Sequence, residues 1–341
     1  MGFRWPDGVG NVEHDGDDIR IQISMPTDEH GFLGRKCPSC SQLFRIDADA
    51  YQGLWDDAEL WCVYCGHDEN SAFITDQQLN RAMRPIGDWA EQSFNQMLSD
   101  TFGKVPKSRS RSGIGIEITY RSDPFYPQPL PGINEEELVR IRTCTSCGTR
   151  YAVFGEHRYC PVCGPLSAEV VAGDALDAET SRLDALNLVA PEEVRELREQ
   201  GVFNRIWVDT LENLVTIVET LARTVFNAAV SDATSRLKSK GNVFQRLDDL
   251  ADLFVDAGYP DVRTLVSEGV WLRLQESWAT RHVFTHNDGL IDDKFVSKVR
   301  GSAKLGQRAR VTEPMCRQAI TDVRALCAVI AGFTAHSAPP S

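Results

Sequence analysis

The stretch of sequence that decides the fold reads Arg281-His-Val-Phe-Thr-His286-Asn-Asp-Gly-Leu-Ile-Asp292. It ends an amphipathic helical run and passes directly into a glycine-containing turn. The arginine offers a permanent cation with several donors, which suits phosphate, and a histidine five residues later can give or take a proton near neutral pH. Together the two side chains could cleave a phosphodiester without a metal. The same pair also fits a structural role, in which Arg281 pairs with a carboxylate and His286 caps the helix.

This stretch resembles the R-x4–6-H motif of the HEPN family, small helical bundles found in many prokaryotic ribonuclease toxins and defence proteins. Arg281 and His286 match the two motif positions, and His282 stands where the family usually has a polar residue. The tail from His286 to Asp292 is similar to the H-N-x-G-I/L-I/V-D run of the Apea-like branches. The resemblance covers roughly residues 203–335.

The resemblance implies metal-independent cleavage of RNA. The RNA 2′-hydroxyl would attack the adjacent phosphorus and leave a 2′,3′-cyclic phosphate. His286 would transfer a proton, and Arg281 would stabilise charge on the pentavalent phosphate. Two protomers of the family usually bring their motifs into one cleft, so a homodimer and no catalytic metal are expected. His282 and Asn287 are expected as supporting polar groups.

Basic residues follow the motif closely. Lys294, Lys298, Arg300 and Lys304 are candidates for holding an RNA backbone beside the site, with binding that weakens as salt rises. The chain as a whole is acidic, with a net charge of −13. It is therefore not a general nucleic-acid coat protein, and any basic surface is local. A solvated face of mixed charge is the alternative interpretation of these residues.

The N-terminal half carries a metal-binding pattern. Eight of the ten cysteines fall into four C-x2-C pairs: Cys37, Cys40, Cys62, Cys65, Cys144, Cys147, Cys160 and Cys163. Two such pairs close a tetrahedral shell with no open position, so we predict two structural zinc ions. Pairing within each half closes the shorter loops, and a cross-braced pairing is the alternative. A redox role is disfavoured because no βαβ pattern surrounds the cysteines.

The remaining sequence around these cysteines indicates small β-rich zinc ribbons. Strand-like runs lie between the pairs, at Leu43–Ile46 and Arg150–Phe154. The acidic balance of this half favours a protein partner or trigger over RNA as what the ribbons contact. Cys316 and Cys327 lie among apolar neighbours on the last expected helix, and we interpret them as core thiols.

The predicted fold class is mainly α, with a C-terminal HEPN-like helical bundle preceded by two small β-rich four-cysteine zinc ribbons. We divide the chain into an N-terminal segment with ribbon 1 (1–75), a helix and basic linker (76–112), a strand with ribbon 2 (113–170), an acidic helical linker (171–202) and the bundle (203–341). The helix at 76–102 carries one apolar stripe, and Pro85 should kink or split it.

Four main helices are expected in the bundle, at 203–235, 243–257, 261–286 and 313–333. The third should break near Gly269, and Thr312 can cap the fourth. Five residues turn a helix by about 500°, so Arg281 and His286 should converge only if the helix frays at His286.

Two functions stay open at this point. One is an endoribonuclease effector, toxin-like or antiviral, in which the zinc ribbons act as a sensor or as a positioning module. The other is a non-enzymatic zinc-ribbon adaptor or sensor that dimerises through its helical half. No apolar run reaches the ~18 residues of a membrane span, and the start lacks the apolar core of a signal peptide. We therefore expect a cytoplasmic protein without membrane contact.

Overall fold

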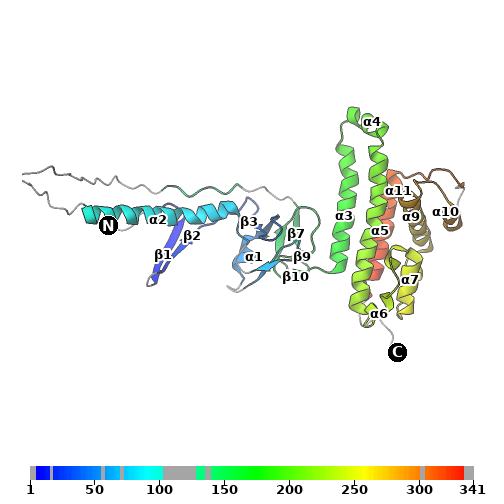
Figure 1. Ribbon diagram of the computed structural model, residues 1–341, viewed down its shortest axis with the longest axis horizontal. Coiled ribbons are helices and arrows are strands. Elements are labelled where there is room, and N and C mark those ends of the chain that lie inside the picture. The colour runs from blue at the N-terminus through cyan, green and yellow to red at the C-terminus, as the bar shows by residue number, and fades with distance from the viewer. Residues whose placement is uncertain are drawn as a thin grey trace, which may run out of the picture. The chain divides into compact units, whose positions relative to one another are not determined.

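The structure, a computed structural model, describes residues 5–15, 18–54, 58–69, 73–102, 128–134, 140–299 and 304–333. It is mainly helical with small antiparallel sheets, which confirms the fold class at that level. The chain forms two compact units (Figure 1). The first comprises Met1–Phe154 and Arg158–Pro165, and the second Gly155–His157 and Leu166–Ser341. The expected basic linker at 104–113 and strand at 115–120 lie outside the described residues, and so does Arg300.

The first unit contains the short strands. Their bounds are β1 (Val9–Asp15), β2 (Asp18–Ile23), β3 (Phe32–Lys36), β4 (Leu43–Asp47), β5 (Leu60–Trp61), β6 (Asp68–Glu69), β7 (Ile141–Thr143), β8 (Arg150–Ala152), β9 (Tyr159–Cys160) and β10 (Gly164–Pro165). The unit also holds the helices α1 (Ala48–Gln52) and α2 (Asp76–Phe102).

One four-stranded sheet, ordered β3-β4-β8-β7, joins the two halves of this unit. β4 pairs antiparallel with β8, so that Ile46 stands opposite Tyr151. Both side chains are buried, together with Phe44. The strands expected between the cysteine pairs are therefore present. The two ribbons, which the sequence suggested were separate, share a sheet and a core.

Helix α2 differs from its expectation in two respects. Of the two expected effects of Pro85, a kink or a split, the split does not occur, because the helix runs continuously from Asp76 to Phe102. A proline interrupts only its own N–H bond and crowds the preceding turn, so one helix can continue through it. The apolar stripe is largely exposed, while Gln78, Pro85 and Asp88 on other faces are buried.

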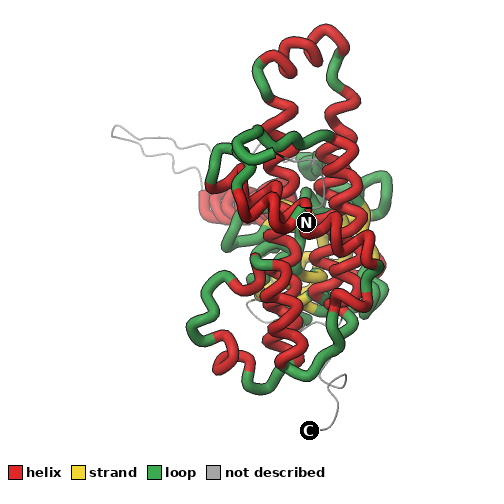
Figure 2. The backbone as a smooth tube through the Cα atoms, turned by 90° about the vertical axis from the view of Figure 1, so that its right-hand side faces the viewer, coloured by secondary structure: helices red, strands yellow, loops and turns green. Residues whose placement is uncertain are grey.

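The second unit is a bundle of helices, most of which are joined by short connections (Figure 2). The bounds are α3 (Ala168–Ala185), η1 (Leu186–Leu188), α4 (Pro191–Glu199), α5 (Val202–Ala229), α6 (Ala233–Leu237), η2 (Val243–Gln245), α7 (Leu247–Asp256), α8 (Val262–Leu265), α9 (Glu268–His286), α10 (Asp293–Lys298) and α11 (Glu313–Ala331). None of the described helices is both long enough and apolar enough to cross a membrane.

The core of the bundle lies mainly between α3, α5, α9 and α11. Helix α3, which we assigned to an acidic linker, contributes Ala172, Leu176 and Leu183 to this core. Its carboxylates misled the sequence interpretation because they pair with arginines of a distant helix while remaining partly exposed. Two ion pairs of 2.8 Å join Asp177 to Arg324 and Asp184 to Arg317 on α11. The bundle therefore begins before residue 203.

The expected helices of the bundle are present with shifted ends. The third is divided into α8 and α9, and Ser267 caps α9 by accepting the N–H of Val270. The break thus lies just before Gly269. Thr312 occupies the cap position of α11, but its side chain makes no capping hydrogen bond. Cys316 and Cys327 are buried core thiols, as expected, and burial raises the pKa of each to about 12.

Candidate functional site

The eight paired cysteines gather into two clusters in the first unit. One contains Cys37, Cys40, Cys62 and Cys65, and the other Cys144, Cys147, Cys160 and Cys163. Each cluster combines the pairs of one half, as expected from loop closure. Sγ atoms of different C-x2-C pairs within one cluster approach each other to 3.5–3.7 Å. Four thiolates bound tetrahedrally to zinc at ~2.3 Å would stand about 3.8 Å apart. The donor set and its spacing therefore fit two structural metal sites.

Backbone groups support each cluster. The amide of Cys40 donates to the Sγ of Cys37 at 3.4 Å, and that of Val162 donates to the Sγ of Cys160 at 3.5 Å. Such donors stabilise a thiolate ligand. The turn following each cluster's second cysteine pair ends in a glycine with positive φ, Gly66 in one case and Gly164 in the other.

The two clusters are held against each other by reciprocal contacts. The amide of Trp61 donates to the carbonyl of Pro161, and the amide of Tyr159 donates to the carbonyl of Val63. The rings of Trp61 and Tyr159 stack with centroids 6.0 Å apart and planes within 7°. Each ring also covers the glycine of the opposite cluster. The two clusters therefore form one packed body with near-twofold local symmetry.

A second candidate site is a cleft of about 390 Å³ in the helical unit. Its walls come from the C-terminal half of α9, from α10 and from the segment that joins η2 to α7. The polar and charged residues that line it are Asn242, Gln245, Arg246, Asp248, Asp249, Gln275, Arg281, His282, His286, Asp292, Lys294 and Lys298. The cleft thus contains both residues of the Arg–His pair.

The helix does not fray to bring this pair together. Helix α9 continues through His286, and the N–H of Asn287 bonds the carbonyl of Val283 as the helix ends. The expected fraying is therefore wrong. Arg281 and His286 reach one cleft from a regular helix because the arginine side chain spans about a turn. The Nε of Arg281 is buried and has no hydrogen-bond partner within the described part of the chain.

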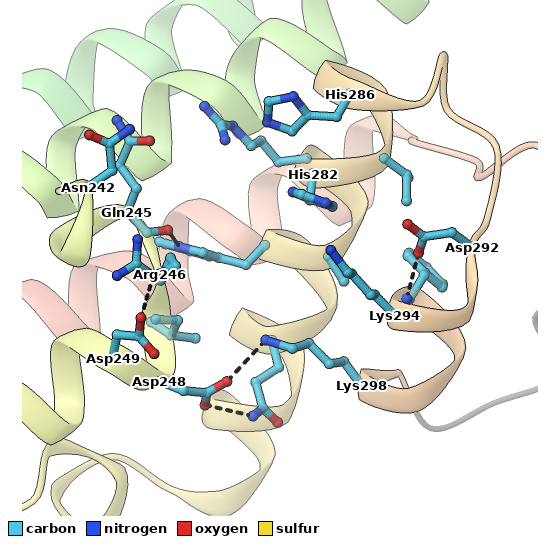
Figure 3. A pocket seen from close by; sticks show the side chains of 17 residues that line it. Asn242, Gln245, Arg246, Asp248, Asp249, His282, His286, Asp292, Lys294 and Lys298 are labelled. Atoms are coloured by element: carbon cyan, nitrogen blue, oxygen red, sulfur yellow. Dashed lines mark hydrogen bonds and ion pairs between the residues drawn. The ribbon is translucent and has the colours of Figure 1, made fainter. Parts of the chain in front are cut away.

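His282 lies one turn before His286 on α9 and lines the same cleft (Figure 3). The two ring centroids are 4.8 Å apart. Burial lowers the pKa of His282 below the usual histidine value, and the charge of His286 lowers it further. The carboxylate of Asp292 acts in the opposite direction. The lowered pKa favours the neutral form of His282.

The carboxylates of the cleft are already engaged. Asp248 pairs with Lys298 at 3.2 Å, and Asp249 pairs with Arg246. Asp292 accepts the amide of Phe295 at 2.8 Å and so caps α10.

Two cationic side chains that line the cleft are available to bind a ligand. Over the residues that the structure describes, no hydrogen bond or ion pair engages the Lys294 amine or the Arg281 guanidinium. Figure 3 shows the Lys294 side chain extending from α10 toward α9 beside His282. An anion could therefore be held between α9 and α10.

The other predicted residues have different positions. Asn287 does not line the cleft; its side-chain amide donates to the carbonyl of Leu290 at 2.6 Å and stabilises the turn. Lys298 lines the cleft but is tied to Asp248, and Lys304 is exposed outside the lining. Of the predicted RNA-binding lysines, Lys294 is the one that is both in the cleft and without a partner there.

Sequence reasoning missed the wall formed by η2 and α7. The indole of Trp278 donates to the carbonyl of Gln245 at 3.1 Å, and the amide of Gln275 donates to Asp248 at 3.1 Å. These bonds hold that wall against α9. No local motif marks Asn242 or Gln245, because only the packing of α7 against α9 brings them to the cleft.

Comparison with known proteins gives no match: no family model fits the chain, and no curated protein or solved structure shows significant similarity to it. The resemblance to the HEPN family therefore stays a prediction that rests on the motif.

Proposed function

We propose that this protein is a metal-independent endoribonuclease of HEPN type, acting as a toxin-like or antiviral effector. One observation carries the proposal. The guanidinium of Arg281, with its buried and unpartnered Nε, lines the same cleft as the imidazoles of His282 and His286. A phosphate-binding cation and two proton carriers are what cleavage of RNA by its own 2′-hydroxyl needs.

The proposed reaction proceeds in one displacement at phosphorus. A neutral imidazole takes the proton of the 2′-hydroxyl while the O2′–P bond forms. The P–O5′ bond breaks, and a protonated imidazole gives its proton to the leaving O5′. The products are a 2′,3′-cyclic phosphate and a 5′-hydroxyl. Arg281 and Lys294 stabilise the negative charge that builds on the phosphoryl oxygens.

The two imidazoles are suited to different parts of this reaction. The lowered pKa of His282 favours the neutral form and hence the role of base. His286 is the other imidazole of the cleft and lies in the last turn of α9. We therefore assign the role of base to His282, which leaves proton donation to His286; the motif itself implied only that His286 transfers a proton.

Two further features belong to the proposal. A homodimer in which two bundles bring their clefts together would double the cations around one phosphate. The two cysteine clusters would each hold one structural zinc ion. The body that they form would position the enzyme or receive a protein trigger, since the N-terminal half is acidic and disfavours RNA.

The test is cleavage of total RNA by the full chain in magnesium-free buffer with EDTA, with zinc content verified afterwards. Wild-type protein should leave cyclic-phosphate ends. His286→Ala should reduce the rate by about 10²–10⁴, the usual range for loss of an acid–base group. Arg281→Lys should also fail because lysine lacks the planar fork. Matched controls are His30→Ala and Arg205→Lys, which alter exposed side chains of the same kinds outside the cleft.

Full activity of His286→Ala would show that this cleft is not the active site. A second function, a non-enzymatic adaptor or sensor, is favoured by the ion pairs that already engage two cations of the cleft, Lys298 with Asp248 and Arg246 with Asp249. The adaptor hypothesis predicts a stable dimer that neither cleaves RNA nor binds RNA in a salt-sensitive manner.

A further inference from the structure

The two histidines of the cleft have the spacing of a metal chelate. His282 and His286 are four residues apart on the regular helix α9, so they lie one turn apart on the same face. Histidines at this spacing on a helix supply two ligands of one zinc ion in H-E-x-x-H sites. Both residues are exposed, so an ion can reach them from solvent.

The separation of the two rings also fits a shared ion. Their centroids are 4.8 Å apart, and their planes are inclined by 53°. An ion bound ~2.1 Å from one nitrogen of each ring, with an angle of about 90–110° at the metal, would hold the centroids about 4.6–5.3 Å apart. The Cβ–Cγ torsion of histidine is broad, so each ring can turn one nitrogen toward the ion without movement of the helix.

The ring nitrogens of this pair are available for binding. In the part of the chain that the structure describes, no hydrogen bond or ion pair engages the ring of His282 or His286 (Figure 3). His157 differs, because its Nδ1 lies 3.0 Å from a carboxylate oxygen of Asp174 and both side chains are buried. A histidine that belongs to the packed interior is held by such a partner, whereas the pair in the cleft has none.

We propose that His282 and His286 together bind one divalent transition-metal ion of the zinc type, in addition to the two ions of the cysteine clusters. Imidazole nitrogen suits zinc, copper and nickel ions, whereas magnesium and calcium prefer oxygen ligands. Among the described residues, no carboxylate, thiol or third imidazole lies close enough to complete a set of three ligands. Water therefore fills the remaining positions, and the ion exchanges more readily than one held by four cysteines.

Charged residues of the cleft act on such an ion in opposite directions. The carboxylate of Asp292 attracts it, and the cations Arg281 and Lys294 repel it. Beside the larger effect of burial, Asp292 raises the pKa of His282 and the two cations lower it, so all three act electrostatically on the pair. The opposing charges predict a moderate affinity and a definite sign for the effect of each substitution.

The ion would inhibit the cleft, a consequence that rests on the proposed function. A nitrogen bound to a metal has donated the lone pair that would accept a proton. Neither imidazole could then serve as base or acid in RNA cleavage. Because four thiolates bind zinc more tightly than two imidazoles, the cysteine clusters would fill first, and inhibition would begin only when metal is in excess.

Nickel alone is the probe, because paramagnetic Ni²⁺ broadens the NMR signals of the rings that bind it. The full chain, with zinc-loaded clusters and ¹³C-labelled histidines, is titrated at about pH 8, where an ordinary imidazole is neutral. The signals of His282 and His286 should broaden together with one midpoint. In His282→Ala the midpoint for His286 should rise at least about tenfold, because one ligand of the chelate is lost. His30→Ala, outside the cleft, should leave the midpoint unchanged.

An unchanged His286 midpoint in His282→Ala would show that the rings do not share an ion and would overturn the proposal, as would the absence of broadening. Asp292→Asn, which keeps a capping side chain for α10, should weaken nickel binding. Lys294→Gln should strengthen it, each change being about 2- to 5-fold. Effects of the opposite sign would mean that the ion lies elsewhere.

Cleavage is measured separately from binding. Wild-type protein that cleaves RNA in EDTA is assayed again after removal of the chelator, and nickel should then inhibit with the midpoint found by NMR, whereas magnesium should not. Cleavage that persists at saturating nickel would overturn the inhibitory role. A chain that binds nickel through both rings but cleaves no RNA would support the metal site and count against the proposed ribonuclease.

Discussion

Replacing Gly66 by alanine should strongly weaken the first cysteine cluster, whereas the same change at Gly148 should be mild. Both glycines have left-handed backbones, with φ of 73° and 76°. Alanine in this region costs about 1–2 kcal/mol at either position. The difference lies in the surroundings. A Cβ at Gly66 would stand 2.3 Å from the Cζ of Tyr159, while nothing lies within 4 Å of a Cβ at Gly148.

The additional cost at Gly66 follows from this overlap. Tyr159 must move by more than about 1 Å to restore ordinary contact, and it stacks on Trp61. Overpacking of a tight contact typically costs about 1–3 kcal/mol, and an aromatic pair contributes about 0.5–1.5 kcal/mol. Gly66→Ala should therefore cost about 2–3 kcal/mol more than Gly148→Ala. Because zinc binding and ribbon folding are coupled, this equals a loss in zinc affinity of about 30- to 150-fold.

Competition with a chromophoric zinc chelator measures the affinity of each ion in the full chain. A double-mutant cycle with Tyr159→Ala isolates the contact, since Gly66→Ala should cost only the backbone term once the ring is absent. Equal losses for Gly66→Ala and Gly148→Ala would refute the reasoning, and so would a full Gly66→Ala penalty in the Tyr159→Ala background.

Three further outcomes are expected. Elemental analysis should find about two zinc atoms per chain, one for each four-cysteine cluster, and a value near one would contradict this. In NMR titrations the pKa of His282 should lie below the ordinary histidine value; Asp292→Asn should lower it further, because the raising carboxylate is lost, and Lys294→Gln should raise it. Shifts of the opposite sign would show that these charges do not act on His282. Arg273→Met removes the bidentate partner of the buried Asp322 carboxylate and should lower the free energy of unfolding of the bundle, measured in urea, by about 2 kcal/mol. An unchanged midpoint of urea unfolding would mean that the pair is not formed.

Local patterns predicted the elements of this chain well. A C-x2-C pair chelates through its own turn, so the spacing alone grouped the cysteines into clusters. The periodic apolar positions located α5, α7, α9 and α11 because helix formation depends on neighbours three and four residues away. The motif residues Arg281 and His286 also lie in one cleft.

Partnerships between distant segments could not be predicted in the same way. The acidic residues of α3 suggested a solvated linker, but arginines of α11 pair with them, and sequence spacing does not reveal such partners. The stripe of α2 was visible in the sequence, yet only the structure shows it exposed. The importance of His282 beside His286 likewise emerged from ring geometry and burial.

The sequence by itself determined the two four-cysteine clusters, the helical C-terminal half and the presence of an arginine and a histidine at the end of α9. Tertiary structure alone decided that the ribbons share one sheet, that α3 belongs to the bundle and that η2 and α7 form the second wall of the cleft. The physical reason is the distance along the chain over which each kind of interaction acts. Turn, helix and chelation preferences act over a few residues, whereas burial and charge pairing depend on which distant surfaces meet when the chain packs.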